Sequence, residues 1–365
     1  MAFCPFREKI SVSTVEHLMG NYEKSTCCKM APLLLDNQAG DMSLIKKETG
    51  KANNRRGQKM FKKVLTATGM PDACDPALIT ALEMAKQNQG KLFIIHVLEA
   101  TYRHECGPQE SVKDFKTGEA VAPTHEYKEA VKAELDKKCA GALRPYGNYE
   151  IIVVEGRPGI EIRRWASKVG ADLVVLGPHA ERLEEEKELA GDSRGNTVED
   201  VIAYITSPVM IVNSFFPKER LAFKKILVCI DFSRSCEYAC RFAIKLAHKY
   251  GAKLFLFHML STSAGGYNKT DLDKEINASK EKVAEFCKIP QGIEYEYAIW
   301  EGTQPSSDIL KIAYEKQADL VVMGSHVKET GDKWYIGSAV EEVSAKCSCP
   351  VAVVTHPNAV LKGES

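Results

Sequence analysis

Two kinds of hydrophobic pattern alternate along this chain of 365 residues. Short apolar runs rich in β-branched residues show no polar alternation, which is typical of strands buried on both faces. Between them lie stretches with apolar residues three and four positions apart, such as Ala239, Phe242 and Ala243, which predict amphipathic helices. The predicted strands are Val64–Thr68, Leu92–Leu98, Tyr149–Val154, Asp172–Leu176, Ile226–Ile230, Leu254–Leu260, Glu294–Ile299 and Asp319–Met323, with one more after each of Pro208 and Pro350. The predicted helices include Gly159–Lys168, Ser306–Glu315 and one beginning at each of Gly195 and Gly337.

The second half of the chain repeats the first. Phe-Lys-Lys-Val-Leu at 61–65 recurs as Phe-Lys-Lys-Ile-Leu at 223–227, and this offset of 162 residues holds through His96 and His258. Near the ends of the halves, Ala-Asp-Leu-Val-Val-Leu-Gly at 171–177 matches Ala-Asp-Leu-Val-Val-Met-Gly at 318–324. A fixed period of this length indicates a tandem duplication.

Alternating strands and helices place each repeat in the α/β class. We expect a three-layer domain of about 150 residues, with a mainly parallel sheet covered by helices on both faces. The predicted parts of the chain are an N-terminal extension (1–59), a first domain (60–213), a linker (214–221), a second domain (222–356) and a C-terminal tail (357–365).

Composition and charge narrow the class of protein. Lys plus Arg and Asp plus Glu number 49 each, so the net charge is zero, whereas nucleic-acid-binding proteins usually show a basic excess. Hydrophobic residues make up 44%, which excludes a wholly disordered chain. No segment approaches the ~20 apolar residues of a transmembrane helix, and the run Met30–Leu35 is too short for a signal-peptide core. We therefore expect a cytoplasmic protein with no membrane span and no nucleic-acid partner.

The twelve cysteines are too few for a disulfide scaffold. The closest pairs are Cys27 with Cys28 and Cys347 with Cys349, and neither has the spacing of a Cys-x-x-Cys motif or a zinc site. Some of these thiols can be redox-active. The favoured interpretation is that they are buried and have no chemical role, and no metal site is expected.

Several blocks resemble a known family. Lys-Ile-Leu-Val-Cys-Ile-Asp-Phe-Ser at 225–233 is similar to the opening of a universal stress protein domain. Ala-Asp-Leu-Val-Val-Met-Gly-Ser-His at 318–326 resembles its fourth strand and glycine loop, and the segments 337–340 and 349–354 resemble its closing helix and strand. Because ordered blocks match in both repeats, the chain is identified as a tandem member of this family.

The family resemblance implies a flavodoxin-like, Rossmann-like fold for each repeat. That fold has a five-stranded sheet with strand order 3-2-1-4-5. Family members commonly dimerise through the last strand, so the resemblance implies an intramolecular pseudo-dimer of the two repeats. Pro208–Val212 and Pro350–Val354 would then lie near a pseudo-two-fold axis.

Some members of this family bind ATP through a pattern resembling Gly-x-x-Gly, nine residues, then Gly-Ser/Thr. Glycines let the backbone approach the phosphates, and amides at a helix N-terminus donate to them. In the second repeat Gly324 is followed thirteen residues later by Gly337, whereas Val327 replaces the second glycine and restricts the loop. The resemblance implies a site for ATP or AMP in the second repeat only, with Asp231 facing the nucleoside. The candidate residues are Asp231, Ser233, Met259, Gly324, His326, Gly337, Ser338 and Ala339.

The first repeat departs further from the ATP-binding pattern. Gly69 occupies the position equivalent to Asp231, Ala180 replaces the second glycine and Asn196 replaces the serine. Its glycine loop is five residues longer and carries an acidic run at 184–188, which repels phosphate. We expect this repeat to bind no nucleotide and to pack against the second. His96 and His258 end the second strands, and a partly buried, hydrogen-bonded histidine is expected at each.

No catalytic motif is present in the sequence, neither a Gly-x-Ser-x-Gly elbow nor a phosphate loop of the Gly-x-x-x-x-Gly-Lys type. We therefore expect a nucleotide-responsive binding or signalling module of the stress response rather than an enzyme. Two alternatives stay open. One is a family member that binds proteins and no nucleotide, and the other is a weak ATPase of the nucleotide-binding α/β group.

The N-terminal extension carries ten Lys or Arg and six Asp or Glu residues and shows no sustained hydrophobic period. It is expected to be largely disordered or weakly helical. Because Met60 directly precedes the first repeat, the extension is interpreted either as a product of upstream translation or as a docking arm for an anionic partner.

Overall fold

The computed structural model describes residues 60–69, 75–99, 111–114, 117–177, 197–261, 269–325, 327–330 and 333–357. All of them belong to one compact unit, Arg56–Ser365. The expectations for the N-terminal extension and for most of the C-terminal tail therefore concern residues outside the described ones.

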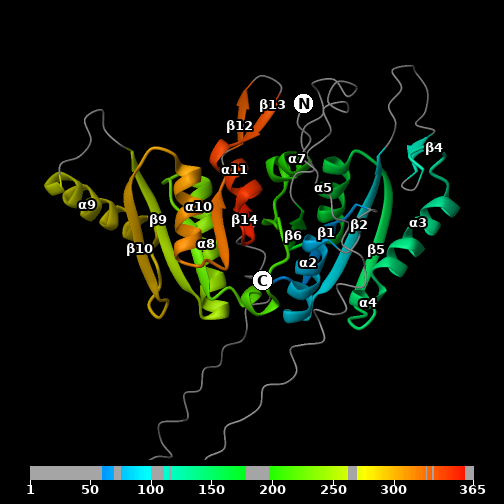
Figure 1. The fold of residues 1–365 in the computed structure, drawn as a ribbon, viewed down its shortest axis with the longest axis horizontal. Helices are drawn as coiled ribbons and strands as arrows, with labels where there is room; N and C mark the ends of the chain where they lie inside the picture. Colours follow the sequence, from blue (N-terminus) through cyan, green and yellow to red (C-terminus); the bar gives the residue numbers. More distant parts are fainter. Residues whose placement is uncertain are drawn as a thin grey trace, which may run out of the picture. The chain divides into compact units, whose positions relative to one another are not determined.

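Ten strands form one continuous sheet (Figure 1). The strands of the first half are β1 (Lys63–Ala67), β2 (Lys91–Glu99), β5 (Tyr149–Gly156), β6 (Leu173–Leu176) and β7 (Val209–Ile211). Those of the second half are β8 (Lys225–Cys229), β9 (Lys253–Ser261), β10 (Tyr295–Gly302), β11 (Leu320–Gly324) and β14 (Val351–Val354). The order across the sheet is β10-β9-β8-β11-β14-β7-β6-β1-β2-β5. Within each half all strand pairings of this sheet are parallel, and the α/β fold predicted from the sequence is confirmed.

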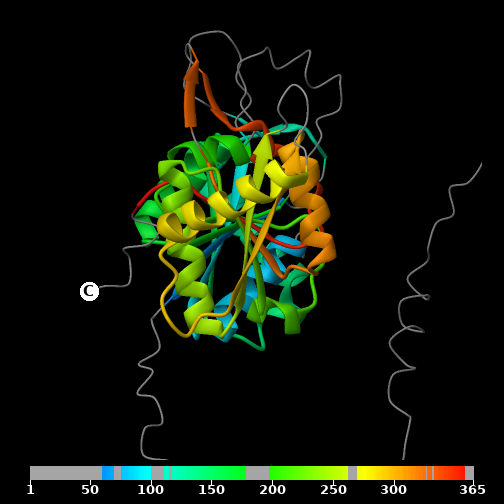
Figure 2. The ribbon, with the colours of Figure 1, turned by 90° about the vertical axis from the view of Figure 1, so that its left-hand side faces the viewer.

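Helices cover both faces of the sheet (Figures 1 and 2). One face carries α2 (Pro76–Gln87), α3 (His125–Lys138), α4 (Ala140–Leu143), α8 (Arg234–Tyr250) and α9 (Lys269–Cys287). The other carries α5 (Pro158–Val169), α7 (Thr197–Tyr204), α10 (Pro305–Glu315) and α11 (Ser338–Lys346). Each apolar layer between helices and sheet runs through both halves, because residues of both repeats belong to each cluster. In the part of the chain that is described, no helix is long and apolar enough to cross a membrane.

Two short hairpins lie outside the main sheet, and the sequence had suggested only loops there. The first pairs β3 (Val112–Lys113) with β4 (Ala120–Val121). The second pairs β12 (Val327–Thr330) with β13 (Lys333–Ile336) and projects from the top of the molecule in Figure 1. This second hairpin occupies the segment that the sequence assigned to the glycine loop.

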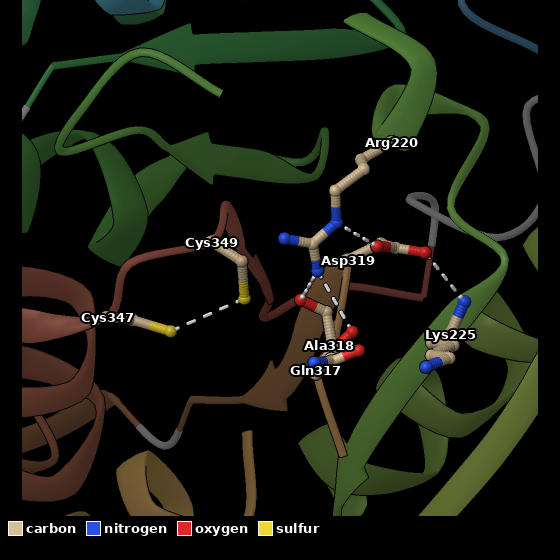
Figure 3. A network of polar contacts seen from close by, with 7 residues as sticks. All are labelled: Arg220, Lys225, Gln317, Ala318, Asp319, Cys347 and Cys349. Atoms are coloured by element: carbon tan, nitrogen blue, oxygen red, sulfur yellow. Dashed lines mark hydrogen bonds and ion pairs between the residues drawn. The ribbon is translucent and has the colours of Figure 1, made fainter. Parts of the chain in front are cut away.

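One aspartate in each half ties the start of the first strand to the start of the fourth. Asp172 accepts hydrogen bonds from two backbone N–H groups at the entry to β1, at 2.7 and 3.0 Å. Asp319 accepts one from the backbone N–H of Lys225 at 3.0 Å and one from Arg220 Nε at 2.6 Å (Figure 3). This contact explains why the Ala-Asp-Leu-Val-Val block recurs, since the carboxylate sets the register of two central strands.

The linker is fixed to the second half by Arg220. This residue lies in a short 3-10 helix, Lys218–Ala222, and its Nη2 donates to the carbonyl oxygens of Gln317 and Ala318, each at 2.9 Å. Its guanidinium also lies over the ring of Phe216 at 4.8 Å from the centroid. The segment between the repeats is therefore an ordered part of the structure.

The last strands of the two halves pair antiparallel, and this pairing joins the halves. Val209 lies opposite Val353, Met210 opposite Ala352 and Ile211 opposite Val351. Since Pro208 and Pro350 are equivalent in the repeat, Met210 and Ala352 are equivalent too. The pairing therefore has a local two-fold axis between these two residues, both of which are fully buried in the same apolar cluster.

Further contacts between the halves lie beside α2 and α8. The ring of Phe61 packs edge-on against Phe242, with centroids 6.3 Å apart. Asn88 Nδ2 donates to the Tyr250 hydroxyl at 3.4 Å, and Lys249 Nζ donates to Asn88 Oδ1. Burial lowers the pKa of Lys249 to about 8. Apolar and polar contacts thus both bind the repeats together.

The large and small side chains at the two-fold axis predict a coupled effect. Met210→Ala should lower the free energy of unfolding by about 2–5 kcal/mol because it opens a cavity. Ala352→Met should lower it by about 1–3 kcal/mol because it overfills the same space. The double variant restores the total volume, so its loss should be clearly smaller than the sum of the single losses. Urea unfolding of the three variants measures this, and additive losses would contradict the packing.

Candidate functional site

Several candidate residues of the second repeat lie along the same end of neighbouring strands. β8 is paired with β9 on one side and with β11 on the other, all in parallel. Asp231 and Ser233 follow β8, Met259 lies toward the end of β9, and Gly324 ends β11. In open α/β sheets this end of the strands is where ligands bind.

Asp231 and Ser233 shape the start of α8. Asp231 is exposed, and its Oδ1 accepts a hydrogen bond from the backbone N–H of Ser233 at 2.9 Å. Ser233 is the N-cap of α8, and its hydroxyl accepts from the backbone N–H of Cys236 at 3.1 Å. Each side chain therefore has a structural task in the turn, whatever else it contacts.

Phe232, between them, covers His258. Its backbone is left-handed, with φ of 61°, and its ring lies edge-on to His258 and Phe286, at centroid distances of 4.6 and 5.4 Å. Lys282 Nζ lies 4.1 Å from the centroid of the Phe232 ring. This aromatic packing offsets the cost of a left-handed conformation at a residue with a side chain.

Both paired histidines are hydrogen-bonded, as expected, and His258 is partly buried whereas His96 is buried. His258 Nδ1 lies 2.8 Å from the Ile230 carbonyl oxygen, and His96 Nδ1 lies 2.9 Å from that of Thr68. Burial lowers the pKa of His96, which favours its neutral form. Both rings therefore hold the end of the first strand of their half.

Gly324 is required by packing between β11 and α8. A Cβ at this position would lie 2.4 Å from the backbone nitrogen of Cys236 and 2.5 Å from the carbonyl carbon of Ser235. Both atoms belong to the backbone, so no side-chain rotation can relieve the clash. The glycine thus permits close approach of a helix to the strand.

Met259 lies against the end of β10. A Cβ on Gly302 would lie 2.9 Å from the Met259 sulfur and 2.1 Å from Asp308 Oδ2. Met259 is half-buried beside the apolar cluster on one face of the sheet. The glycine at the end of the strand makes room for the methionine and for the first turn of α10.

The N-terminus of α11 has a different character. Gly337 is its N-cap, with φ of −37°, and no side chain within the described part of the chain caps the helix. The Gly337 carbonyl accepts from the backbone N–H groups of Val340 and Glu341, at 2.9 and 3.2 Å. A Cβ on Gly337 would meet no described atom within 4 Å. Neither a left-handed backbone nor close packing against a described atom accounts for this glycine. Ser338 and Ala339 carry the first amides of the helix, which have no acceptor within it.

Ser325, which follows Gly324, is a functional candidate that the sequence did not single out. Only 3% of the residue is exposed, and its Oγ has no hydrogen-bond partner among the described residues. Its backbone N–H donates to the Val354 carbonyl at 3.3 Å. A buried hydroxyl without a partner is costly, and its place beside the end of β11 puts it in the candidate region.

The segment of the glycine pattern forms a hairpin rather than the expected loop. Val327, at the position of the second glycine, begins β12 and pairs with Ile336, the residue before Gly337. Gly-Asp at 331–332 is the sequence signature of a hairpin with a two-residue turn. This signature explains why a hairpin forms instead of the expected loop. His326 lies outside the described residues.

In the first repeat, most of the corresponding segment is not among the described residues. This applies to 178–196, which contains Ala180, the acidic run and Asn196. Asp75 is the N-cap of α2 and accepts from the Leu78 backbone N–H at 2.7 Å. α8 begins at Arg234 and α2 at Pro76, and residues 72–74, which correspond to the start of α8, are not among the described ones. No group of three or more His, Cys, Asp or Glu side chains able to hold a metal occurs in the described regions.

Comparison with known proteins agrees with this fold. Residues 60–213 and 222–355 each match the universal stress protein family. A universal stress protein of Methanocaldococcus jannaschii is 28% identical over 155 residues, covering 40% of this chain and 91% of that protein. One of Bacillus subtilis is 29% identical over 152 residues, covering 36% of this chain and 99% of that protein. The crystal structure of a universal stress protein from Archaeoglobus fulgidus shares the fold with a TM-score of 0.54 and 20% identity, covering 81% of this chain and 97% of that one.

The fold is that of a tandem α/β protein, and its candidate ligand-binding site lies at the carboxyl ends of parallel strands. Since the two family matches cover most of the sequence, the chain belongs to the universal stress protein family and contains two of its domains.

The packing of Gly324 predicts an unequal effect of the same substitution in the two halves. Gly324→Ala should lower the free energy of unfolding by about 1–3 kcal/mol, because its Cβ would overlap the backbone of α8. Gly177 is the equivalent residue, and a Cβ there would meet no described atom within 4 Å, so Gly177→Ala is the matched control with little expected loss. Thermal unfolding compares the two. Equal losses would contradict the packing role of Gly324.

Proposed function

We propose that the second repeat binds an adenine nucleotide, ATP or AMP, with its phosphates at the N-terminus of α11. The observation that carries this proposal is the uncapped start of that helix at Gly337, where the backbone needs no glycine and an added Cβ would meet no described atom within 4 Å. The family pattern read from the sequence assigns phosphate binding to the same position.

The physical basis is the unpaired amides and the dipole of the helix. The first N–H groups of a helix have no partner within it, and the N-terminus carries about half a positive charge. Phosphate oxygens accept from such groups readily. In α11 the amides of Ser338 and Ala339 and the Ser338 hydroxyl are the donors of the proposed site, and the exposed position of Gly337 and Ser338 leaves them accessible.

Two neighbouring features support the same location. The buried Ser325 hydroxyl, without a described partner, can complete a hydrogen bond to a bound group or a water. The β12–β13 hairpin begins three residues after Gly324 and ends directly before Gly337, so it borders the proposed phosphate position. Asp231, exposed after β8, stays the proposed contact for the nucleoside.

The proposed role is a nucleotide-responsive module whose task is binding rather than turnover. Two observations support this role. The sequence contains no catalytic motif, and the Asp231 and Ser233 side chains accept hydrogen bonds from the backbone in the turn before α8. The proposal assigns the site to the second repeat only. The cytoplasmic location and the intramolecular pseudo-dimer stay predictions, and the antiparallel contact of β7 with β14 supports the second of these.

A graded series at Gly337 tests the proposal. Wild type should bind one ATP per chain in calorimetry, and Gly337→Ala should bind similarly because its methyl group enters open space. Gly337→Asp places a carboxylate at the phosphate position, which costs roughly 1–4 kcal/mol and weakens binding about fivefold to several hundredfold. The same aspartate is a good N-cap, so it should leave the unfolding free energy unchanged or raise it by a few tenths of a kcal/mol.

Gly337→Asn is the matched control, because it has the size and capping ability of aspartate without the charge. It should weaken ATP binding less than Gly337→Asp does. No binding heat from wild type would overturn the proposal in favour of a protein-interaction role. Two equivalent sites per chain would contradict the assignment to the second repeat. Phosphate release from ATP that is lost in Gly337→Asp would favour the ATPase alternative.

A further inference from the structure

Cys347 and Cys349 bring their sulfur atoms together in the turn between α11 and β14. The two Sγ atoms are 3.5 Å apart (Figure 3). Cys347 is the C-cap of α11, and Cys349 lies two residues before β14. Only 3% of Cys347 and 4% of Cys349 is exposed, whereas Ser348 between them is exposed. The thiols therefore point inward beneath a surface turn.

The surroundings make the two sulfurs unequal. The two thiols share one hydrogen bond, and the backbone N–H groups of Cys349 and Ser348 also hydrogen-bond to the Cys347 sulfur. These hydrogen bonds lower the pKa of Cys347, while the shared proton raises that of Cys349. Cys347 is thus the sulfur prepared to lose its proton, and Cys349 is the thiol that stays protonated beside it.

We propose that Cys347 and Cys349 form an oxidisable dithiol, which a small hydroperoxide converts into a disulfide within the turn. The geometry that supports this is the contact between the sulfurs, which must close from 3.5 Å to about 2.05 Å. Because only Ser348 separates the two cysteines, the disulfide can form by a local change within the turn. This site is independent of nucleotide binding at α11.

The chemistry has two steps. The Cys347 thiolate attacks one oxygen of the peroxide, the O–O bond breaks, and the leaving hydroxide takes up a proton, giving a sulfenic acid at Cys347 and water. The Cys349 sulfur then attacks the Cys347 sulfur, the S–O bond breaks, and the hydroxide leaves as water with the Cys349 proton. In total, two thiols and one hydrogen peroxide yield one disulfide and two waters.

A second cysteine pair in the same domain provides an internal control. Cys240 and Cys287 place their sulfurs 3.4 Å apart between α8 and α9, and both residues are buried. There the hydrogen bonds to the Cys236 and Cys287 thiols, together with burial, raise the pKa of Cys240, and no backbone N–H donor is among the causes. The two pairs have similar sulfur separations but different surroundings. Because the thiolate is the reacting form, the pairs are expected to differ in their rate of oxidation.

The peptide map of the chain allows a clean measurement. Trypsin cuts after Lys346 and Lys362, so both cysteines are released in one peptide that contains no other cysteine. The reduced full-length protein is treated with hydrogen peroxide, then unfolded, alkylated and digested. Peptide 347–362 should lose two hydrogen masses. It should escape alkylation sooner than Cys240 or Cys287 becomes blocked, because its backbone N–H donors favour the reacting thiolate.

Single variants distinguish the roles of the two sulfurs. Cys349→Ser should leave a sulfenic acid at residue 347 that dimedone traps, because no second thiol resolves it. Cys347→Ser should give little trapping at Cys349. Thermal unfolding of both variants checks that they fold. Oxidised glutathione, which is too large for the buried thiols, should produce the disulfide much more slowly than peroxide in the folded protein.

Three results would overturn the proposal. In the first, peptide 347–362 stays fully alkylated at peroxide doses that already oxidise Cys240 and Cys287. In the second, the two pairs oxidise at equal rates. In the third, the disulfide forms only after the protein has unfolded, which would show that the native turn contributes nothing.

Discussion

The antiparallel contact of β7 with β14 is the constraint on which the rest of this structure depends. A domain that ended at either strand would expose a short apolar edge, which invites association. Pairing the two equivalent strands buries both edges and makes one sheet of ten strands. Each apolar layer then continues across the junction, so the two halves stabilise one another. The ordered linker follows from this arrangement, because Arg220 needs to reach only the neighbouring turn at Gln317 and Ala318.

Glycines that look alike in the sequence serve different purposes in the structure. Gly324 allows the backbone of α8 to pack against β11, and Gly302 makes room for Met259 and α10. Neither needs a ligand to explain it. Gly337 has no such packing partner among the described residues, and its helix lacks a capping side chain. Of the two glycines of the family pattern that the second repeat keeps, Gly324 is explained by packing, so the proposed ligand binding rests on Gly337 at the start of α11.

The sequence predicted the elements well where one physical pattern dominated. Buried parallel strands appear in the sequence as uninterrupted apolar runs. Because the chain is duplicated, each strand is represented by two such runs. The strands and the α/β class could therefore be predicted directly. The β12–β13 hairpin was missed because the glycine pattern suggested a loop, although the Gly-Asp turn signal at 331–332 was present. The role of Gly324, the unpartnered hydroxyl of Ser325 and the contact of Cys240 with Cys287 depend on how separate elements pack, which local periodicity does not specify.

Comparing the two halves distinguishes the contacts that hold the sheet in both from the features that occur in only one. Asp172 and Asp319 bind the entry to the first strand in each half, and His96 and His258 bind its end with nearly the same geometry. These shared contacts hold the sheet. The two halves differ in sequence at the turn before α8 and at both ends of α11. The dithiol follows the same logic, because the first half has Ser207 where the second has Cys349, and the Ser207 hydroxyl donates to the Ala171 carbonyl at 2.6 Å. A position whose side chain donates a hydrogen bond to the backbone in one copy thus carries a thiol of the proposed dithiol in the other.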